Sequence, residues 1–173
     1  DAEEADSGRF YRLHKGVLVE SGLARVSITN GPALSPHGRS LYHTDTLGKR
    51  IWRTRIADDG ALHDTSLFVE IEEGAGYPDG PTVDAEGCLW TGLFAGWAAR
   101  RYDPAGKLMT EVRFPVANVT KIAFGGADLS VAYATTARKG LTDRQLVEQP
   151  LAGDLFAFDP GVRGLPGPLA AIS

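Results

Sequence analysis

The fold is decided by one repeated stretch, Asp79-Gly80-Pro81-Thr82-Val83-Asp84-Ala85-Glu86-Gly87-Cys88-Leu89-Trp90. A copy of its pattern lies 49 residues earlier, as Asn30-Gly31-Pro32-Ala33-Leu34-Ser35-Pro36-His37-Gly38-Arg39-Ser40-Leu41-Tyr42 (position 79 against 30, and 87 against 38). Each copy contains a polar residue, a Gly-Pro step, a short apolar strand, a turn with glycine and a strand that ends in an aromatic residue. A weaker third copy begins near Thr120.

A second strand signature follows the copies of the first. It consists of alternating polar and apolar residues and occurs at positions 9–13, 51–55, 99–103 and 154–159. The intervals of roughly 40 to 55 residues match the period of a four-stranded β-propeller blade. A β-sandwich is the alternative, but it would not explain why both signatures return at this interval. We therefore predict an all-β chain that forms part of a β-propeller.

The number of copies indicates how much of a propeller is present. Three copies of the first signature and four of the second correspond to about three and a half blades. We expect residues 1–173 to belong to a single propeller domain whose N-terminal blades are absent from this chain. Because an open ring would leave unpaired strand edges, we expect those blades to precede this chain or a second chain to complete the propeller.

Composition and charge exclude several classes of partner. The 173 residues are 43% hydrophobic and 23% charged, with a net charge of −4, and they contain no basic stripe that would favour nucleic acid. The one basic group, Lys49, Arg50, Arg53 and Arg55, alternates along a predicted strand and is typical of a solvated face. No apolar run approaches the roughly 20 residues that cross a membrane.

The chain begins with an acidic segment that does not resemble a signal peptide, and we expect a cytoplasmic protein. Cys88 is the single cysteine, which excludes an intrachain disulfide and a cysteine zinc site. Its apolar neighbours predict a buried side chain rather than a nucleophile.

Asn30 and Asp79 are the candidate metal ligands, because they occupy the same repeat position before an apolar strand. Inner strands line the channel of a propeller, so we expect both side chains to point toward one spot near its axis. Amide and carboxylate oxygens suit Ca²⁺, Mg²⁺ or Mn²⁺ and are acceptable to Zn²⁺. Thr120, near this position in the third copy, is a poorer ligand. Asn-Gly and Asp-Gly are also common turn dipeptides, which leaves simple turn formation as the alternative.

His43 lies at the end of a predicted inner strand, where it could face the channel. No spacing of the four histidines suggests a histidine-based metal motif. No nucleophile elbow, phosphate-binding loop or dinucleotide fingerprint is present either.

Several linked motifs resemble the SMP-30/gluconolactonase/regucalcin family in order and spacing. They are Ile28-Thr29-Asn30-Gly31, Tyr42-His43-Thr44-Asp45-Thr46, Pro78-Asp79-Gly80, the stretch 84–90, Phe124-Gly125-Gly126, the stretch 136–141 and the stretch 150–156. The resemblance covers nearly the whole chain. It implies a six-bladed propeller with one divalent metal ion, Ca²⁺, Zn²⁺, Mn²⁺ or Mg²⁺, in its channel.

The resemblance also implies a ligand set. The family's ligands are a glutamate from the first blade, an asparagine in Asn-Gly and an aspartate in Pro-Asp-Gly, and the last two map onto Asn30 and Asp79. The Glu-Gly-Pro segment of the first ligand has no counterpart here, so the chain resembles the C-terminal part of a family member. A substrate-contacting glutamate of the family maps onto the acidic start, and we assign Glu4 to it.

The implied function is metal-dependent hydrolysis of a sugar lactone. In this hypothesis the metal polarises the lactone carbonyl, Asp79 acts as general base toward water, and Asn30 is only a ligand, because an amide does not relay protons. The expected partner is a small-molecule sugar lactone. A non-catalytic metal-binding or interaction propeller is the alternative, and hydrolysis of another ester or a phosphotriester is a third possibility.

Overall fold

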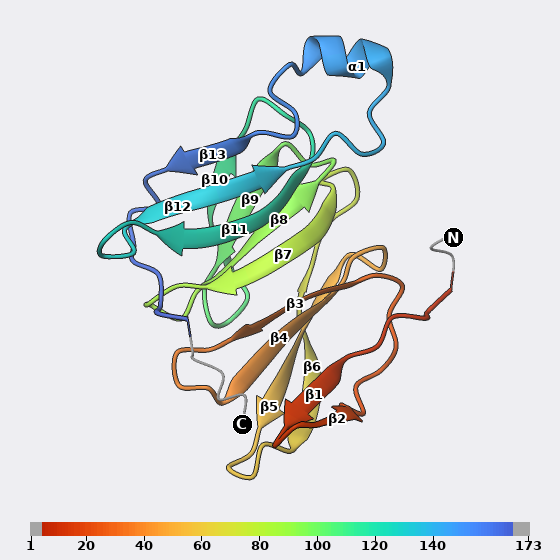
Figure 1. Cartoon of the computed structure of the whole chain (residues 1–173), viewed down its shortest axis with the longest axis vertical. Helices are drawn as coiled ribbons and strands as arrows, with labels where there is room; N and C mark the ends of the chain where they lie inside the picture. Colours follow the sequence, from red (N-terminus) through yellow and green to blue (C-terminus); the bar gives the residue numbers. More distant parts are fainter. Residues whose placement is uncertain (1–4, 168–173) are drawn as a thin grey trace.

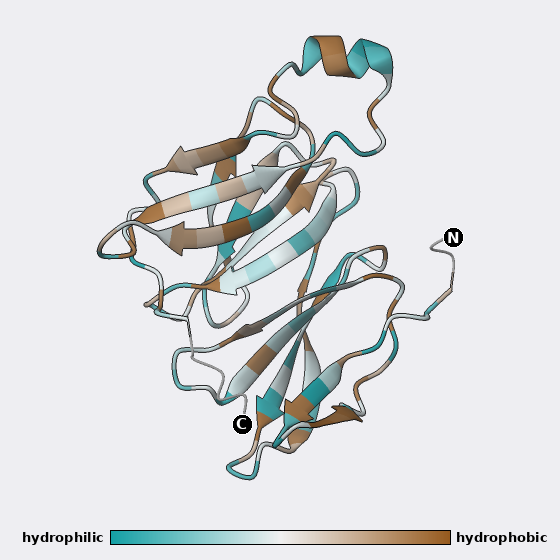
Figure 2. Cartoon of the chain, in the orientation of Figure 1, coloured by the Kyte–Doolittle hydropathy of each residue, from teal (hydrophilic) through white to brown (hydrophobic). Residues whose placement is uncertain are grey.

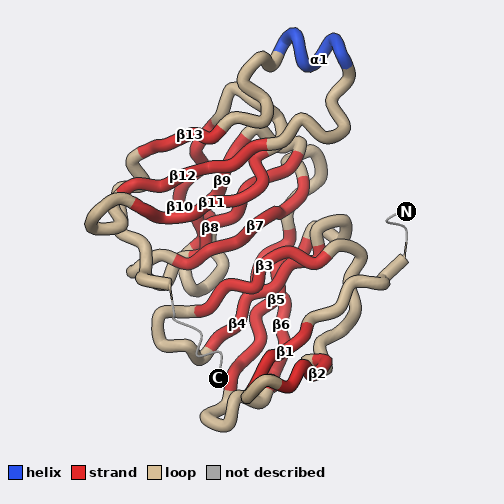
Figure 3. Tube along the Cα trace, viewed as in Figure 1, coloured by secondary structure: helices blue, strands red, loops and turns tan. Residues whose placement is uncertain are grey.

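The computed structural model describes residues 5–167, which form antiparallel sheets and one short helix (Figures 1 and 3). A hairpin, β1 (Tyr11–His14) and β2 (Val17–Glu20), comes first. The first complete sheet contains β3 (Thr29–Leu34), β4 (Ser40–Asp45), β5 (Arg50–Ile56) and β6 (Leu62–Glu70). The second contains β7 (Tyr77–Val83), β8 (Leu89–Phe94), β9 (Ala98–Tyr102) and β10 (Leu108–Arg113). The third contains β11 (Val119–Gly125), β12 (Val131–Thr136) and β13 (Leu155–Phe158).

Each sheet is a meander in which neighbours in sequence pair in space, as in a propeller blade. The first strand signature of the sequence begins at β3, β7 and β11, and these strands lie side by side in Figure 1. The second signature falls on β5, β9 and β13, the third strand of each sheet, and on β1. By this equivalence β1 and β2 are the outer strands of a preceding blade, and the predicted three and a half blades are confirmed.

Two apolar clusters lie between successive blades. Leu89 and Trp90 are adjacent on β8, so their side chains point to opposite faces of that sheet, and neither is exposed. Leu89 belongs to the cluster shared with the blade β3–β6, which is called the first blade from here on. Trp90 belongs to the cluster shared with the third blade, β11–β13. This is why hydropathy changes along individual strands rather than from strand to strand (Figure 2).

Asp84 holds the second blade together from a fully buried position at the β7–β8 turn. One carboxylate oxygen accepts hydrogen bonds from the backbone N–H groups of Glu86 and Cys88, both at 3.0 Å. The other accepts from Trp90 Nε1 at 2.9 Å and from Arg101 Nε at 2.8 Å. The buried charge is therefore fully hydrogen-bonded, which is the condition under which such a charge is tolerated.

One short helix, α1 (Asp143–Glu148), lies in the connection between β12 and β13. Thr142 caps it in a reciprocal capping box with Gln145. Within residues 5–167 no helix has the length and apolar character needed to cross a membrane.

The three inner strands share an irregularity. The pairing register shifts between Asn30 and Ala33 in β3, between Asp79 and Thr82 in β7, and directly after Val119 in β11. Such bulges insert an extra residue and redirect the side chains beside it. The bulge therefore recurs at the repeat position that the sequence analysis selected.

Glycines allow neighbouring inner strands to approach each other closely at these bulges. Gly80 has a φ of +45°, and a Cβ atom there would lie 2.3 Å from the carbonyl oxygen of Thr120. A Cβ atom on Gly31, at a φ of +94°, would lie 3.1 Å from Pro81 Cγ. Glycine thus follows Asn30 and Asp79 because the next inner strand occupies the space that a side chain would need.

Replacing Gly80 tests this contact. Gly74→Ala is the matched control, because Gly74 also has a positive φ (+81°) but nothing lies within 4 Å of an added Cβ. We expect Gly74→Ala to lower the free energy of unfolding by about 1–2 kcal/mol through backbone strain alone. Gly80→Ala should cost about 1–3 kcal/mol more, because backbone atoms must move. Urea unfolding measures both; equal losses would show that the close approach is not the constraint.

His43 does not face the channel. It lies on β4 and is 2% exposed. Its ring packs edge-on against the Phe10 ring, with 4.8 Å between the ring centroids, and its Nε2 lies 3.3 Å from Thr54 Oγ1. Its Nδ1 is buried and has no hydrogen-bond partner within the described residues. Burial lowers the pKa of His43 to about 4, because the charged form loses its hydration.

The chain should therefore lose stability in acid. The unfolded chain binds a proton at His43 near pH 6.5 and the folded chain only near pH 4. The contribution of His43 to the free energy of unfolding is fully present above pH 6.5. It decreases by up to about 3 kcal/mol as the pH falls from 6.5 toward 4. His43→Leu should remove that part of the slope in urea unfolding between pH 7 and 4. Replacement of the exposed His37 with Gln is the control; an unchanged slope in His43→Leu would contradict the assignment.

Candidate functional site

The candidate site lies where β3 and β7 approach each other. Asn30 and Asp79 are both half-buried, and each precedes the glycine of its inner strand. β3 and β7 are the first strands of their sheets and contact each other directly. The two residues thus occupy equivalent places on neighbouring inner strands; that their side chains point toward one spot near the axis stays a prediction.

A hydrogen-bond relay fixes the amide of Asn30. The Thr46 hydroxyl donates to the carbonyl oxygen of Pro78 at 3.0 Å and accepts from Asn30 Nδ2 at 2.8 Å. A carbonyl oxygen can only accept, so the hydroxyl proton is used there and the group facing Thr46 must be the NH₂ of Asn30. The Oδ1 atom of Asn30 therefore points away from Thr46 and remains available. The relay ends at the residue before Asp79, so it also joins the two candidate ligands.

The carboxyl group of Asp79 lies in an environment that disfavours its charge. Burial raises the pKa of Asp79 to about 6, while a hydrogen bond from the Gly80 backbone and the charge of Lys121 act in the opposite direction. No ion pair of Asp79 occurs among the described residues. A desolvated carboxylate that no ion pair holds is a feature of functional sites more than of structural ones.

Lys121 is the residue that sequence reasoning missed. It lies on β11, half-buried, and its Nζ donates to the carbonyl oxygen of Pro81 at 2.7 Å. Burial lowers the pKa of Lys121, and the nearby charge of Asp79 partly offsets this effect. One signal in the sequence could have identified it: Lys121 occupies the repeat position at which the two stronger copies have Gly31 and Gly80.

The hydroxyl of Thr120 is oriented by a neighbouring strand. It shares a 2.8 Å hydrogen bond with the Thr135 hydroxyl on β12. Cys88 is buried, and burial raises the pKa of its thiol, which is consistent with the expected inert role. Glu4, the predicted substrate contact, lies outside the described residues. Within those residues no three His, Cys, Asp or Glu side chains gather in a group that could hold a metal.

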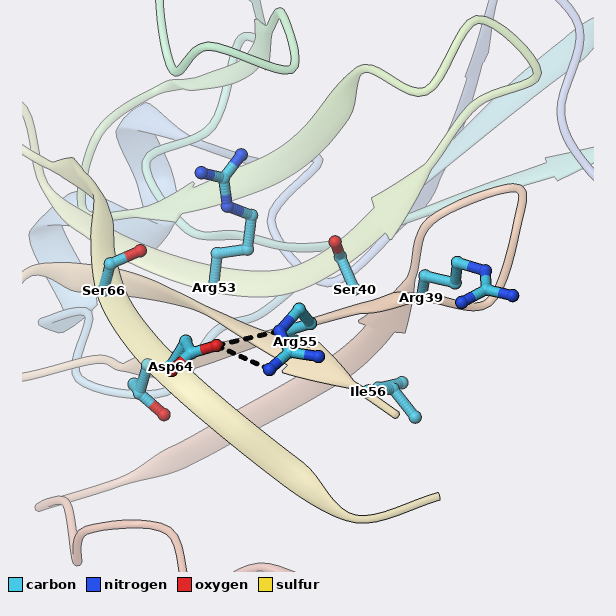
Figure 4. Close-up of a pocket in the computed structure, with 8 residues that line it drawn as sticks. Arg39, Ser40, Arg53, Arg55, Ile56, Asp64 and Ser66 are labelled. Carbon is cyan, nitrogen blue, oxygen red and sulfur yellow. Dashed lines mark hydrogen bonds and ion pairs between the residues drawn. The ribbon is translucent and has the colours of Figure 1, made fainter. Parts of the chain in front are cut away.

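A separate pocket lies on the outer part of the first blade (Figure 4). It contains three arginines, but Arg55 pairs with Asp64 at 2.7 Å and Arg39 with Asp58 at 2.9 Å. The Arg53 guanidinium donates to a backbone carbonyl and lies over the Phe68 ring. Of the basic group noted in the sequence, Arg50 and Arg55 are exposed as expected for a solvated face. Lys49 departs from that expectation: its side chain is only 13% exposed and lies over the Tyr77 ring.

The chain matches the family model described as "SMP-30/Gluconolactonase/LRE-like region" over residues 1–138. It belongs to this family. A 6-deoxy-6-sulfogluconolactonase of Pseudomonas putida is 35% identical over 169 residues, which cover 97% of this chain and 58% of the relative. Regucalcin of Sus scrofa is 34% identical over 166 residues, covering 94% of this chain and 56% of the relative.

Solved structures agree with the family membership. The calcium-binding protein regucalcin of Agrobacterium tumefaciens superposes with a TM-score of 0.82 at 29% identity, over 90% of this chain and 52% of the other. A gluconolactonase of Xanthomonas campestris gives a TM-score of 0.63 at 31% identity, over 73% of this chain and 41% of the other. The chain therefore spans about half the length of its relatives. The predictions of family and of a partial β-propeller are confirmed.

The electrostatics of Asp79 predict a variant that is more stable than the parent chain. Asp79→Asn removes a desolvated charge and keeps an oxygen that can accept from the Gly80 N–H. At pH 8 in EDTA the variant should be more stable than the parent by about 1 kcal/mol, a value discounted for partial solvent access. Asp159→Asn, at an exposed outer position, is the control. A loss of stability in Asp79→Asn would mean that its carboxylate serves the fold.

Proposed function

We propose that this chain carries two metal ligands and the general base of a metal-dependent sugar lactonase. The observation that supports it most is the relay through Thr46. The relay leaves Asn30 Oδ1 without a partner among the described residues. Asn30 lies on β3, and the neighbouring inner strand β7 carries the poorly solvated carboxylate of Asp79. Hard divalent cations bind oxygen donors, and each of these two adjacent inner strands would contribute one.

The donor set fits a divalent metal ion in part. Asn30 Oδ1 has no competing hydrogen bond among the described residues, and metal binding would offset the desolvation that raises the pKa of Asp79. Oxygen donors of this kind suit Ca²⁺, Mg²⁺ or Mn²⁺ and are acceptable to Zn²⁺. The described residues would supply two ligands, and the resemblance assigns the third to a glutamate of another blade.

The chemistry follows from the roles of the two side chains. A bound divalent ion would polarise the lactone carbonyl as a Lewis acid. Asp79 would accept a proton from the attacking water, because a bound cation would keep its carboxylate ionised and thus able to act as a base near neutral pH. Asn30 would hold position only, since an amide neither gives nor takes a proton under these conditions.

The relatives support this assignment at the level of the family. Several carry names of lactonases, including the sulfogluconolactonase already described and a pentonolactonase of Haloferax volcanii, 32% identical over 166 residues. The Agrobacterium structure is described as calcium-binding. We extend to this chain a small-molecule sugar lactone as substrate, from the lactonase names, and a divalent ion as cofactor, from the calcium-binding description.

Proton release in a pH-stat tests the proposal with D-glucono-1,5-lactone and a panel of pentonolactones, with and without EDTA. We expect EDTA-sensitive hydrolysis above the spontaneous rate. Asp79→Ala should lower kcat by at least about 100-fold, the usual contribution of a general base. Asp159→Asn should match the parent.

Two results would overturn the proposal. Hydrolysis unaffected by both EDTA and Asp79→Ala would place the reaction elsewhere. Metal binding at Asn30 and Asp79 without hydrolysis of any lactone, after Ca²⁺, Mn²⁺ or Zn²⁺ is supplied, would instead indicate a non-catalytic metal-binding propeller.

A further inference from the structure

Lys121 presents a half-buried cation that is close enough to Asp79 for the two charges to interact but does not form an ion pair with it. Among residues 5–167 it forms no ion pair, and its hydrogen-bond partner is the carbonyl oxygen of Pro81. An ammonium group carries three N–H donors, so two have no partner among the described residues. A partly desolvated cation with free donors favours an anion as its partner.

The position of this cation is set by packing. Lys121 Cδ lies 2.7 Å from the point where a Cβ atom on Gly80 would sit. The absence of that Cβ allows the lysine stem to cross β7 and reach Pro81. The ammonium is thereby held beside the candidate site from the third inner strand, and Asp79 experiences its charge without forming an ion pair with it.

Its distance from the reacting end decides which part of a substrate it would contact. Lys121 Nζ donates to the carbonyl oxygen of Pro81, two positions beyond Asp79 on β7, so the ammonium meets β7 past the proposed base and not at it. The lactone carbonyl must lie at Asn30 and Asp79 in the proposed function. A group that meets Lys121 therefore belongs to the far end of the sugar rather than to the carbonyl.

We propose that Lys121 is a specificity-determining residue that binds an anionic substituent at the end of the lactone remote from its carbonyl. The substrate class is then acidic sugar lactones, which bear a phosphate, sulfonate or carboxylate group. This inference rests on the proposed function for the placement of the carbonyl. The recognition itself depends only on the free donors and the charge of Lys121.

The kinetic test compares 6-phospho-D-glucono-1,5-lactone with D-glucono-1,5-lactone, which differ in one anionic group. Lys121→Met keeps the length of the stem and removes the charge, and Lys121→Arg keeps the charge. Lys107→Met, at an exposed turn between β9 and β10, is the matched control. The ratio of kcat/KM for the phosphorylated to the neutral lactone should fall at least tenfold in Lys121→Met, mainly through KM. It should stay within a few-fold in Lys121→Arg and be unaltered in Lys107→Met.

A binding experiment separates this inference from the proposed function. Calorimetry in EDTA compares 6-phospho-D-gluconate with D-gluconate, and needs neither metal nor turnover. The parent should bind the phosphorylated acid at least tenfold more tightly, and Lys121→Met should lose that preference. Preference without hydrolysis of either lactone would sustain the role of Lys121 and reject the lactonase proposal. The role of Lys121 would be rejected if the parent bound both acids equally and Lys121→Met lowered kcat/KM for both lactones by the same factor.

Discussion

The contact between neighbouring inner strands is the constraint on which the rest of the structure depends. A carbonyl oxygen on β11 occupies the space that a side chain at Gly80 would need, and Pro81 on β7 does the same at Gly31. Asn30 and Asp79 are the last regularly paired residues before these bulges, and the Gly-Pro step that follows each of them carries the extra residue. The same geometry that lets the blades approach each other therefore presents Asn30 and Asp79 from adjacent strands.

Stability and function draw on different parts of the same blades. The interior of the second blade satisfies its polar groups: Asp84 uses both carboxylate oxygens, and Arg101 pairs with Asp84 and Glu86. At the candidate site the opposite holds, because Asp79 is desolvated without an ion pair and Lys121 has only a carbonyl partner. Local departures from full pairing are expected where a protein binds a ligand, and here two of them adjoin on β7 and β11.

Much of this could be predicted from the sequence, because the repeat is strong where glycine and proline are required. The 49-residue shift aligned Asn30 with Asp79, and the structure places them at equivalent bulges. Lys121 was missed because the third copy lacks the Gly-Pro step that anchors the alignment, and a lone lysine has no pattern of its own. His43 was placed too near the channel, because it lies on β4, the second strand of its blade, and not on the inner strand β3.

The central claim is that Asn30 and Asp79 bind one ion between the inner strands. Crystals grown with Mn²⁺ and measured for anomalous scattering would locate that ion directly. The account predicts a single strong peak at the inner strands, within about 2.0–2.6 Å of Asn30 Oδ1 and of a carboxylate oxygen of Asp79. A structure that binds Mn²⁺ only elsewhere, or leaves these two oxygens without metal at saturating Mn²⁺, would contradict it.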